Sequence, residues 1–247
     1  CVSKYSPFNQ YKNFYEFFRE YGIPDLIWLQ GRQVEQYKKY KDALLPTIEQ
    51  YAVRISQDDA GIKHQAQDRL HVVPLESSTK MHIGDLEKQG TLGNLMVFDT
   101  DMGVRAAIHQ VEAGAVLYED ELVMLPNTEV VDYLMETFGD APDIAYFTHF
   151  RSTRQKLSEH FKQAQLFSSI AHAEGTSMAH MRHMVVINTG YSGAKAAQLR
   201  ERVVNMNRDT EALVHYIVTD GGISQEVYDA VSDKVDYNLR AFRGRRA

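Results

Sequence analysis

Apolar, strand-like runs alternate with helix-like segments through the first part of the chain, and this alternation restricts the possible fold more than any other feature. Runs of apolar and β-branched residues predict strands at 1–3, 26–29, 51–55 and 95–98. Apolar residues at helical spacing predict intervening helices at 8–21, 33–45 and 61–73. Such alternation over short loops is typical of a parallel sheet with helices on both faces. We therefore expect an α/β fold with a Rossmann-type, mostly parallel sheet flanked by helices.

The second part of the chain is predicted to be mixed α+β. A polar insertion over 77–94 separates the earlier elements from the strand at 95–98, and an acidic turn between two apolar runs predicts a hairpin over 115–125. The remaining elements are expected to be helices at 129–138, 153–170 and 194–205 and strands at 144–147, 184–187 and 212–218. No repeat or low-complexity linker interrupts the chain, so we expect a single domain.

Composition excludes several classes of protein. The 247 residues are 44% hydrophobic, which is enough for a sizeable core, and a net charge of −6 disfavours a globally basic nucleic-acid binder. The single cysteine, Cys1, excludes an intrachain disulfide and a cysteine-based zinc site. We expect that residues before Cys1 are missing or were trimmed, rather than that Cys1 is a processed nucleophile or a lipidated residue. No apolar run is long enough to span a membrane, so a soluble, cytoplasmic protein is expected.

Two carboxylates one residue apart follow the apolar run at 95–98. Asp99 and Asp101 would project from the same side of an extended backbone, where both could reach one divalent cation. A turn with a capping aspartate is the simpler interpretation of the same spacing. The predicted sheet favours the metal, because ligands of parallel sheets bind beyond the carboxyl ends of the strands, where this loop and three other polar loops are expected to converge.

The order of these features resembles the GT-A class of nucleotide-sugar glycosyltransferases, especially the phage-type enzymes related to the base-J glucosyltransferase, which glycosylate hydroxymethylated DNA bases. Six segments carry the resemblance over about the first 105 residues: Ser3-Lys4-Tyr5-Ser6-Pro7, Tyr21-Gly22-Ile23, Leu26-Ile27-Trp28-Leu29, Gln33-Val34-Glu35-Gln36-Tyr37, Gly61-Ile62 with Arg69, and Phe98-Asp99-Thr100-Asp101. Two later segments are also similar to the class: Ile187-Asn188-Thr189-Gly190 and Thr219-Asp220-Gly221-Gly222. The family often has Arg-Asn at Arg69-Leu70, and an acidic pair where this chain has Asp220 alone.

The resemblance implies metal-dependent transfer of a sugar, from a UDP-sugar most simply, to an acceptor hydroxyl such as that of a hydroxymethylated base in phage DNA. Residues 1–105 would form the nucleotide-sugar half and 106–247 the acceptor half, in the host cytoplasm if the protein is phage-encoded. Mn²⁺ or Mg²⁺ would neutralise the departing diphosphate, and an Asp would act as general base. The residues implied are Asp99 and Asp101 for the metal, Ser3, Lys4, Tyr5, Arg69 and Asp99 for the donor, Asn188, Gly190 and His183 for the acceptor, and Asp220 as the base.

Other interpretations stay open. A HAD-type phosphohydrolase also has D-x-D after a strand, although normally after the first strand of its domain, and a viral structural or assembly protein would use these aspartates only to cap a turn. His172, Glu174, His180 and His183 could hold zinc or supply a third metal ligand, but surface positions are commoner for such residues. Met178, Met181 and Met184 are expected in the core. The arginines after residue 239 could contact DNA phosphates or form a frayed tail.

Overall fold

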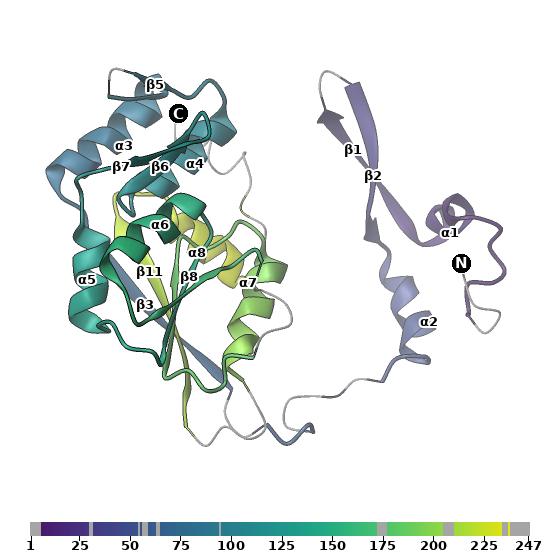
Figure 1. Ribbon diagram of the computed structural model, residues 1–247. Helices are drawn as coiled ribbons and strands as arrows, with labels where there is room; N and C mark the ends of the chain where they lie inside the picture. The colour runs from purple at the N-terminus through teal and green to yellow at the C-terminus, as the bar shows by residue number, and fades with distance from the viewer. Residues whose placement is uncertain are drawn as a thin grey trace. The chain divides into compact units, whose positions relative to one another are not determined.

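The computed structural model describes residues 6–29, 32–53, 55, 59–62, 65–93, 95–171, 177–204, 210–233 and 237. The chain divides into two compact units, Cys1–Ser56 and Gln57–Ala247 (Figure 1). The sequence predicted one domain with two halves meeting at residue 105, but that position lies inside helix α4 (Asp101–Val111). No helix in the described ranges is long and apolar enough to cross a membrane.

The first unit is a helix followed by a β-hairpin. Helix α1 (Phe14–Tyr21) begins where the Asn13 side chain accepts a hydrogen bond from the backbone N–H of Glu16 at 3.0 Å. Strand β1 (Gly22–Leu29) pairs antiparallel with β2 (Arg32–Tyr40), and a 3-10 turn η1 (Asp42–Leu44) leads into α2 (Leu45–Glu49). Aromatic side chains of α1 and β2 form the small core of this unit. The centroids of Phe18 and Tyr37 lie 4.8 Å apart, edge to face.

Two predictions fail in this unit. Residues 33–45 were expected to form a helix, but most of them lie in β2, because pairing with β1 along nearly the whole hairpin satisfies their backbone groups. Residues 51–53 and 55 belong to no strand. Helix 8–21 is correct only from Phe14 onward.

The second unit is built on a five-stranded sheet in which every neighbouring pair is parallel. Its strands, in spatial order, are β3 (Ala66–Pro74), β11 (Ala212–Asp220), β10 (His183–Ile187), β8 (Ile144–Thr148) and β9 (Gln165–Ser168). This arrangement confirms the α/β, Rossmann-type fold class. The strands expected at 144–147, 184–187 and 212–218 are all present.

Helices cover both faces of this sheet (Figure 1). On one face, helices α5 (Glu129–Thr137) and α6 (Arg151–His160) bury Leu134 and Leu157 against Tyr146 of β8. On the other face, helix α7 (Gly193–Arg200), the 3-10 turn η2 (Glu201–Val203) and α8 (Ser224–Ser232) pack over β10 and β11. The three methionines 178, 181 and 184 are buried in this second layer, which confirms the prediction that they belong to the core.

A smaller layer follows β3 in the sequence. It comprises α3 (Ser77–Gln89), β4 (Thr91–Leu92), β5 (Met96–Val97), α4, and the hairpin of β6 (Ala115–Tyr118) and β7 (Glu121–Met124). Its core includes Leu86, Leu92 and Ile108, which share a cluster with Ile223 and Val227 at the start of α8. The predicted hairpin at 115–125 is confirmed.

Three further expectations are wrong in the second unit. The segment predicted as a helix over 61–73 forms β3, which pairs with β11 at all nine of its positions. The polar insertion at 77–94 contains the helix α3. The helix predicted over 153–170 ends at His160, and the segment then turns back as β9 beside β8.

Candidate functional site

The order of the strands reverses between β8 and β10. From β8 the chain passes through α6 to β9 on one side, and from β10 it passes through α7 to β11 on the other. Such a reversal leaves a crevice at the carboxyl ends of the two central strands, where open α/β sheets bind their ligands. The residues that follow Thr148 and Ile187, which are paired in the register, should therefore line a site.

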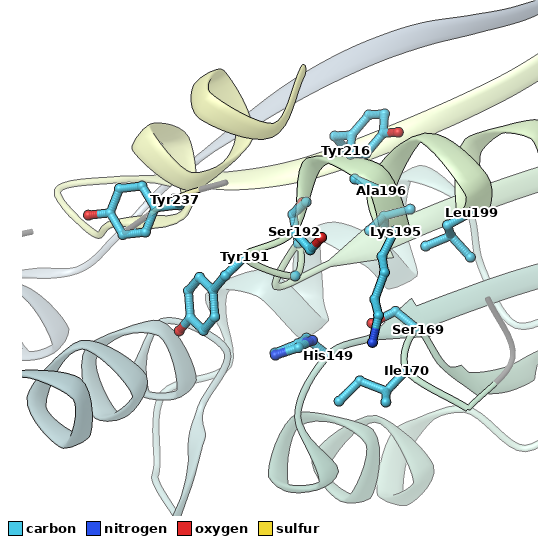
Figure 2. Close-up of a pocket in the computed structure, with 13 residues that line it drawn as sticks. His149, Ser169, Ile170, Tyr191, Ser192, Lys195, Ala196, Leu199, Tyr216 and Tyr237 are labelled. Carbon is cyan, nitrogen blue, oxygen red and sulfur yellow. The ribbon is translucent and has the colours of Figure 1, made fainter. Parts of the chain in front are cut away.

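A cavity of about 390 Å³ lies at this place (Figure 2). Apolar side chains from the sheet and α7 form part of its wall, and polar groups come from the loops after β8, β9 and β10. The polar residues are His149, Ser169, Thr189, Ser192 and Lys195, and three tyrosines, Tyr191, Tyr216 and Tyr237, complete the lining. The cavity thus combines a cationic, hydroxyl-rich part with aromatic surface.

The backbone that leaves β10 is held in an uncommon conformation. Asn188 has φ +52°, and its side chain is fully engaged: Oδ1 accepts a hydrogen bond from Thr153 Oγ1 at 2.6 Å, and Nδ2 donates to the carbonyl of His109 at 2.5 Å. Two residues later, Gly190 passes so near His149 that a Cβ atom there would lie 3.1 Å from the imidazole Nδ1. These contacts direct the loop 189–192 into the wall of the cavity.

The cavity has a positive end. Figure 2 shows the side chain of Lys195, the third residue of α7, extending toward Ser169 and His149. Burial, together with the positive charge of Lys195, lowers the pKa of His149, so the imidazole is neutral at pH 7. Thr189 is 3% exposed, and its Oγ1 has no hydrogen-bond partner among the described residues. An ammonium group, a neutral imidazole and an unsatisfied hydroxyl thus surround one space.

Tyr191 connects the cavity with α4. Its ring faces the guanidinium of Arg105, with the Arg105 Cζ 4.3 Å from the ring centroid. Its hydroxyl lies 3.3 Å from Nδ1 of His109, which is fully buried. Tyr237 stacks beside it at 6.1 Å between centroids, and its backbone N–H donates to the Tyr191 carbonyl.

A buried carboxylate fixes the neighbouring turn between β11 and α8. Oε1 of Glu112 accepts from the backbone N–H of Ile223 and Oε2 accepts from Thr219 Oγ1, both at 2.6 Å. Gly222 lies so close that a Cβ there would be 2.1 Å from the Glu112 carboxyl carbon. Burial raises the pKa of Glu112, although its hydrogen bonds partly offset that rise.

The predicted acceptor residues are separated by the structure. Asn188 and Gly190 belong to the carboxyl edge described above, and Gly190 lines the cavity. His183 is the first residue of β10 and therefore lies at the opposite edge of the sheet. Its hydrogen-bond partner there is His215 of the adjacent strand β11.

These histidines form a chain of hydrogen bonds across three strands, which we call the histidine relay: His71, His215 and His183. His71 Nδ1 lies 2.7 Å from the Tyr133 hydroxyl, and its Nε2 lies 2.9 Å from His215 Nδ1. His215 Nε2 in turn lies 3.1 Å from His183 Nδ1. Burial lowers the pKa of all three, and that of His215 falls to about 4. His183 is thus engaged within the sheet layer and is not placed at the cavity.

The predicted donor and metal residues lie elsewhere in the second unit. Asp99 lies between β5 and α4, and Asp101 is the first residue of α4, where a carboxylate complements the positive end of the helix. Because β5 pairs antiparallel with β4, this strand is not part of the parallel sheet. Arg69 is exposed on the edge strand β3, and Asp220, at the end of β11, forms an exposed ion pair with Lys80 at 2.9 Å.

Several predicted residues lie outside the described residues: Ser3, Lys4, Tyr5, His172, Glu174 and the arginines after residue 239. Within the described ranges, no group of three or more His, Cys, Asp or Glu side chains could hold a metal ion.

Sequence reasoning missed His149, Lys195 and Tyr191, which line the cavity, and Arg105, which contacts the ring of Tyr191. One signal was available, since the turn from β10 to α7 contains Gly190, Gly193 and Lys195 within six residues. Glycines followed by a lysine at a strand-to-helix turn are typical of loops that approach phosphates. The sequence offered no comparable signal for His149 or Arg105.

Comparison with known proteins finds similarity only in the path of the backbone. The crystal structure of the C-terminal part of the Fun30 ATPase domain is similar with a TM-score of 0.45 and 10% sequence identity, over 74% of this chain and 96% of that chain. No family model matches the sequence, and no curated protein matches it.

Proposed function

We propose that the second unit binds a nucleotide in the cavity at the carboxyl ends of β8 and β10. The observation that carries this proposal is the position of Lys195, whose ammonium enters the cavity at the point where the strand order reverses. A phosphate there would receive charge-assisted hydrogen bonds from Lys195 and from the hydroxyls of Ser169 and Ser192. The start of α7 adds the favourable potential of a helix N-terminus.

Aromatic side chains of the lining suit a planar ring. Tyr191, Tyr216 and Tyr237 contribute to the lining, and aromatic side chains stack on bases with little dependence on the base. Thr189 Oγ1, buried and without a partner among the residues that the structure describes, offers one hydrogen bond to a polar ligand atom. A nucleotide satisfies both parts of the cavity at once, whereas an inorganic anion satisfies only the first.

Replacing Lys195 with Met should weaken nucleotide binding by about 10- to 100-fold, because a hydrogen bond to a charged group contributes about 1.5–3 kcal/mol. The measurement is isothermal titration with ADP and UDP. Lys88, which is exposed in the last turn of α3, supplies the matched control, and Lys88→Met should bind like the unaltered protein. Equal affinity in Lys195→Met and Lys88→Met would contradict the proposal.

We propose that the reaction at this site is sugar transfer, with a UDP-sugar as the donor and Mn²⁺ or Mg²⁺ as the cofactor. Hydroxymethylated DNA is one acceptor to be tested, and the reaction would take place in the cytoplasm. Spacing along α4 supports it. Asp101, Arg105 and His109 follow one another at intervals of four residues and so share a helix face, and the last two contact Tyr191 of the cavity wall. Asp101, which would hold the metal together with Asp99, precedes Arg105 by about one helical turn, about 6 Å along the axis of α4.

The unaltered protein should release UDP from UDP-glucose, or from another UDP-sugar of a small panel, only when Mn²⁺ is present. Asp101→Asn should lower this rate by at least about 100-fold, because removing a ligand charge weakens the metal that stabilises the leaving diphosphate. Chromatography of released UDP checks the result, with the exposed Asp132→Asn as control. UDP release that is independent of both Mn²⁺ and Asp101 would refute this reaction but leave nucleotide binding intact.

A further inference from the structure

Arg105 is buried in the second unit, and the described residues give it no acidic partner. Its side chain lies in the middle of α4, and the residue is 7% exposed. Its guanidinium contacts two aromatic rings, with the Cζ 4.3 Å from the Tyr191 centroid and 5.7 Å from that of Tyr237. Of the residues that the structure describes, none forms an ion pair with it, and its Nε is buried without a hydrogen-bond partner.

Such a cation is costly. Removing a charge from water without pairing it is unfavourable, and a contact with an aromatic ring offsets only part of that cost. Helix α4 continues to His109, which is fully buried, and the Nε2 of His109 also has no partner within the described ranges. Two buried nitrogen atoms one helical turn apart therefore lack hydrogen-bond partners among the described residues.

Both unsatisfied groups lie against the wall of the nucleotide cavity. Tyr191 and Tyr237 line the cavity, and the same two rings contact the guanidinium of Arg105. Arg105 itself is not among the lining residues, so a ligand would reach its guanidinium only by displacing these rings. Lys195 is placed at another part of the lining, near His149 and Ser169, so the two cations would meet different groups of one ligand (Figure 2).

We propose that Arg105 binds a second phosphate of the nucleotide, so that the site prefers nucleoside diphosphates to monophosphates. This inference rests on the proposed nucleotide site and adds which nucleotides that site prefers. Lys195 binds one phosphate, and the Arg105 guanidinium binds the other through the planar donor pair that suits phosphate oxygens. The ligand supplies the negative charge that the protein lacks around Arg105.

The test compares UDP with UMP, and ADP with AMP, by isothermal titration. The unaltered protein should bind each diphosphate at least 10-fold more tightly than its monophosphate. Arg105→Met should reduce this ratio to less than about 3 and leave the monophosphate affinity within 2-fold. Arg105→Lys, which keeps the charge, should retain part of the preference. Arg182→Met is the control, because Arg182 pairs with Asp143 near the amino end of β10.

Stability in the absence of nucleotide separates a binding role from a structural one. Replacing an unpaired buried charge with an apolar side chain of similar length should leave the melting temperature of Arg105→Met equal to or above that of the unaltered protein. A fall of more than 5 °C, or an unchanged diphosphate preference in Arg105→Met, would overturn the inference while the nucleotide site stands. Failure of the unaltered protein to bind any of the four nucleotides would instead refute the proposed function, and this inference with it.

Discussion

Replacing Glu112 with Ala should lower the free energy of unfolding of the second unit by about 3–5 kcal/mol. The substitution leaves two buried donors, the Ile223 N–H and the Thr219 hydroxyl, without their acceptor, and each such loss costs about 1–3 kcal/mol. The cavity left by the side chain adds to the loss. Urea unfolding followed by circular dichroism measures the change.

Two further variants show whether this loss comes from the missing acceptors. Glu112→Gln keeps a carbonyl oxygen for Ile223, and its amide can donate to the Thr219 hydroxyl, so the loss should be below about 1.5 kcal/mol. Glu136→Ala, at an exposed position of α5, should change stability by less than about 0.5 kcal/mol. Equal losses in Glu112→Ala and Glu112→Gln would mean that the two hydrogen bonds are not what Glu112 contributes.

Acidification from pH 7 to pH 5 should destabilise the second unit, with His109 alone accounting for about 2 kcal/mol. Burial, aided by the charges of His149 and Arg105, lowers the pKa of His109 to about 3, against about 6.5 in the unfolded chain. Between these two values the unfolded state binds the proton and the folded state does not. Stability is therefore complete above pH 6.5 and falls by about 1.4 kcal/mol per pH unit as the pH drops toward 3.

Other groups modify this slope in known directions. The lowered pKa values of His149 and of the histidine relay act in the same direction as His109. Glu112 acts oppositely, because its raised pKa makes the folded state bind protons more strongly as the pH falls. Measuring the pH dependence in the Glu112→Gln background removes that contribution.

Urea unfolding at pH 7 and pH 5 tests the assignment to His109. His109→Gln should reduce the difference between the two pH values by about 2 kcal/mol, whatever its effect on stability at pH 7. His160→Gln, at an exposed position of α6, is the matched control and should leave the difference unchanged. A difference that His109→Gln leaves intact would contradict a neutral, buried His109.

The sequence was sufficient to predict those elements whose structure is determined by their own residues. The strands at 144–147 and 184–187 are continuous apolar runs, which are expected where both faces of a sheet are covered, and both are fully buried or nearly so. The hairpin at 115–125 is equally local. The fold class was predicted from the alternation in the first part of the chain, yet four of the five strands of the parallel sheet lie in the part that was predicted to be mixed α+β.

The errors arise where tertiary pairing decides the structure. The spacing of Ile62, Ala66, Leu70 and Val73 fits a helix, yet Ala66–Pro74 is an edge strand because β11 supplies its hydrogen bonds from 146 residues further along the chain. Pairing between distant segments also explains why the cavity residues were not predicted. Thr148 and Ile187 are paired neighbours in the sheet, so His149 and the loop after β10 meet, but nothing in the local sequence of either segment indicates the other.

The hydrogen bonds of the histidine relay must all run the same way. With all three rings neutral, they run either from the Tyr133 hydroxyl through His71 and His215 to His183, or in the reverse order, and each order fixes one tautomer for every imidazole. One added proton can be accommodated at His215, which then donates to both neighbours while His71 donates to Tyr133. A second added proton would place two N–H groups against each other at one of the links. Three adjacent strands of this sheet are thus joined by a chain of hydrogen bonds that can bind one added proton. Binding a second proton requires that one of these hydrogen bonds break.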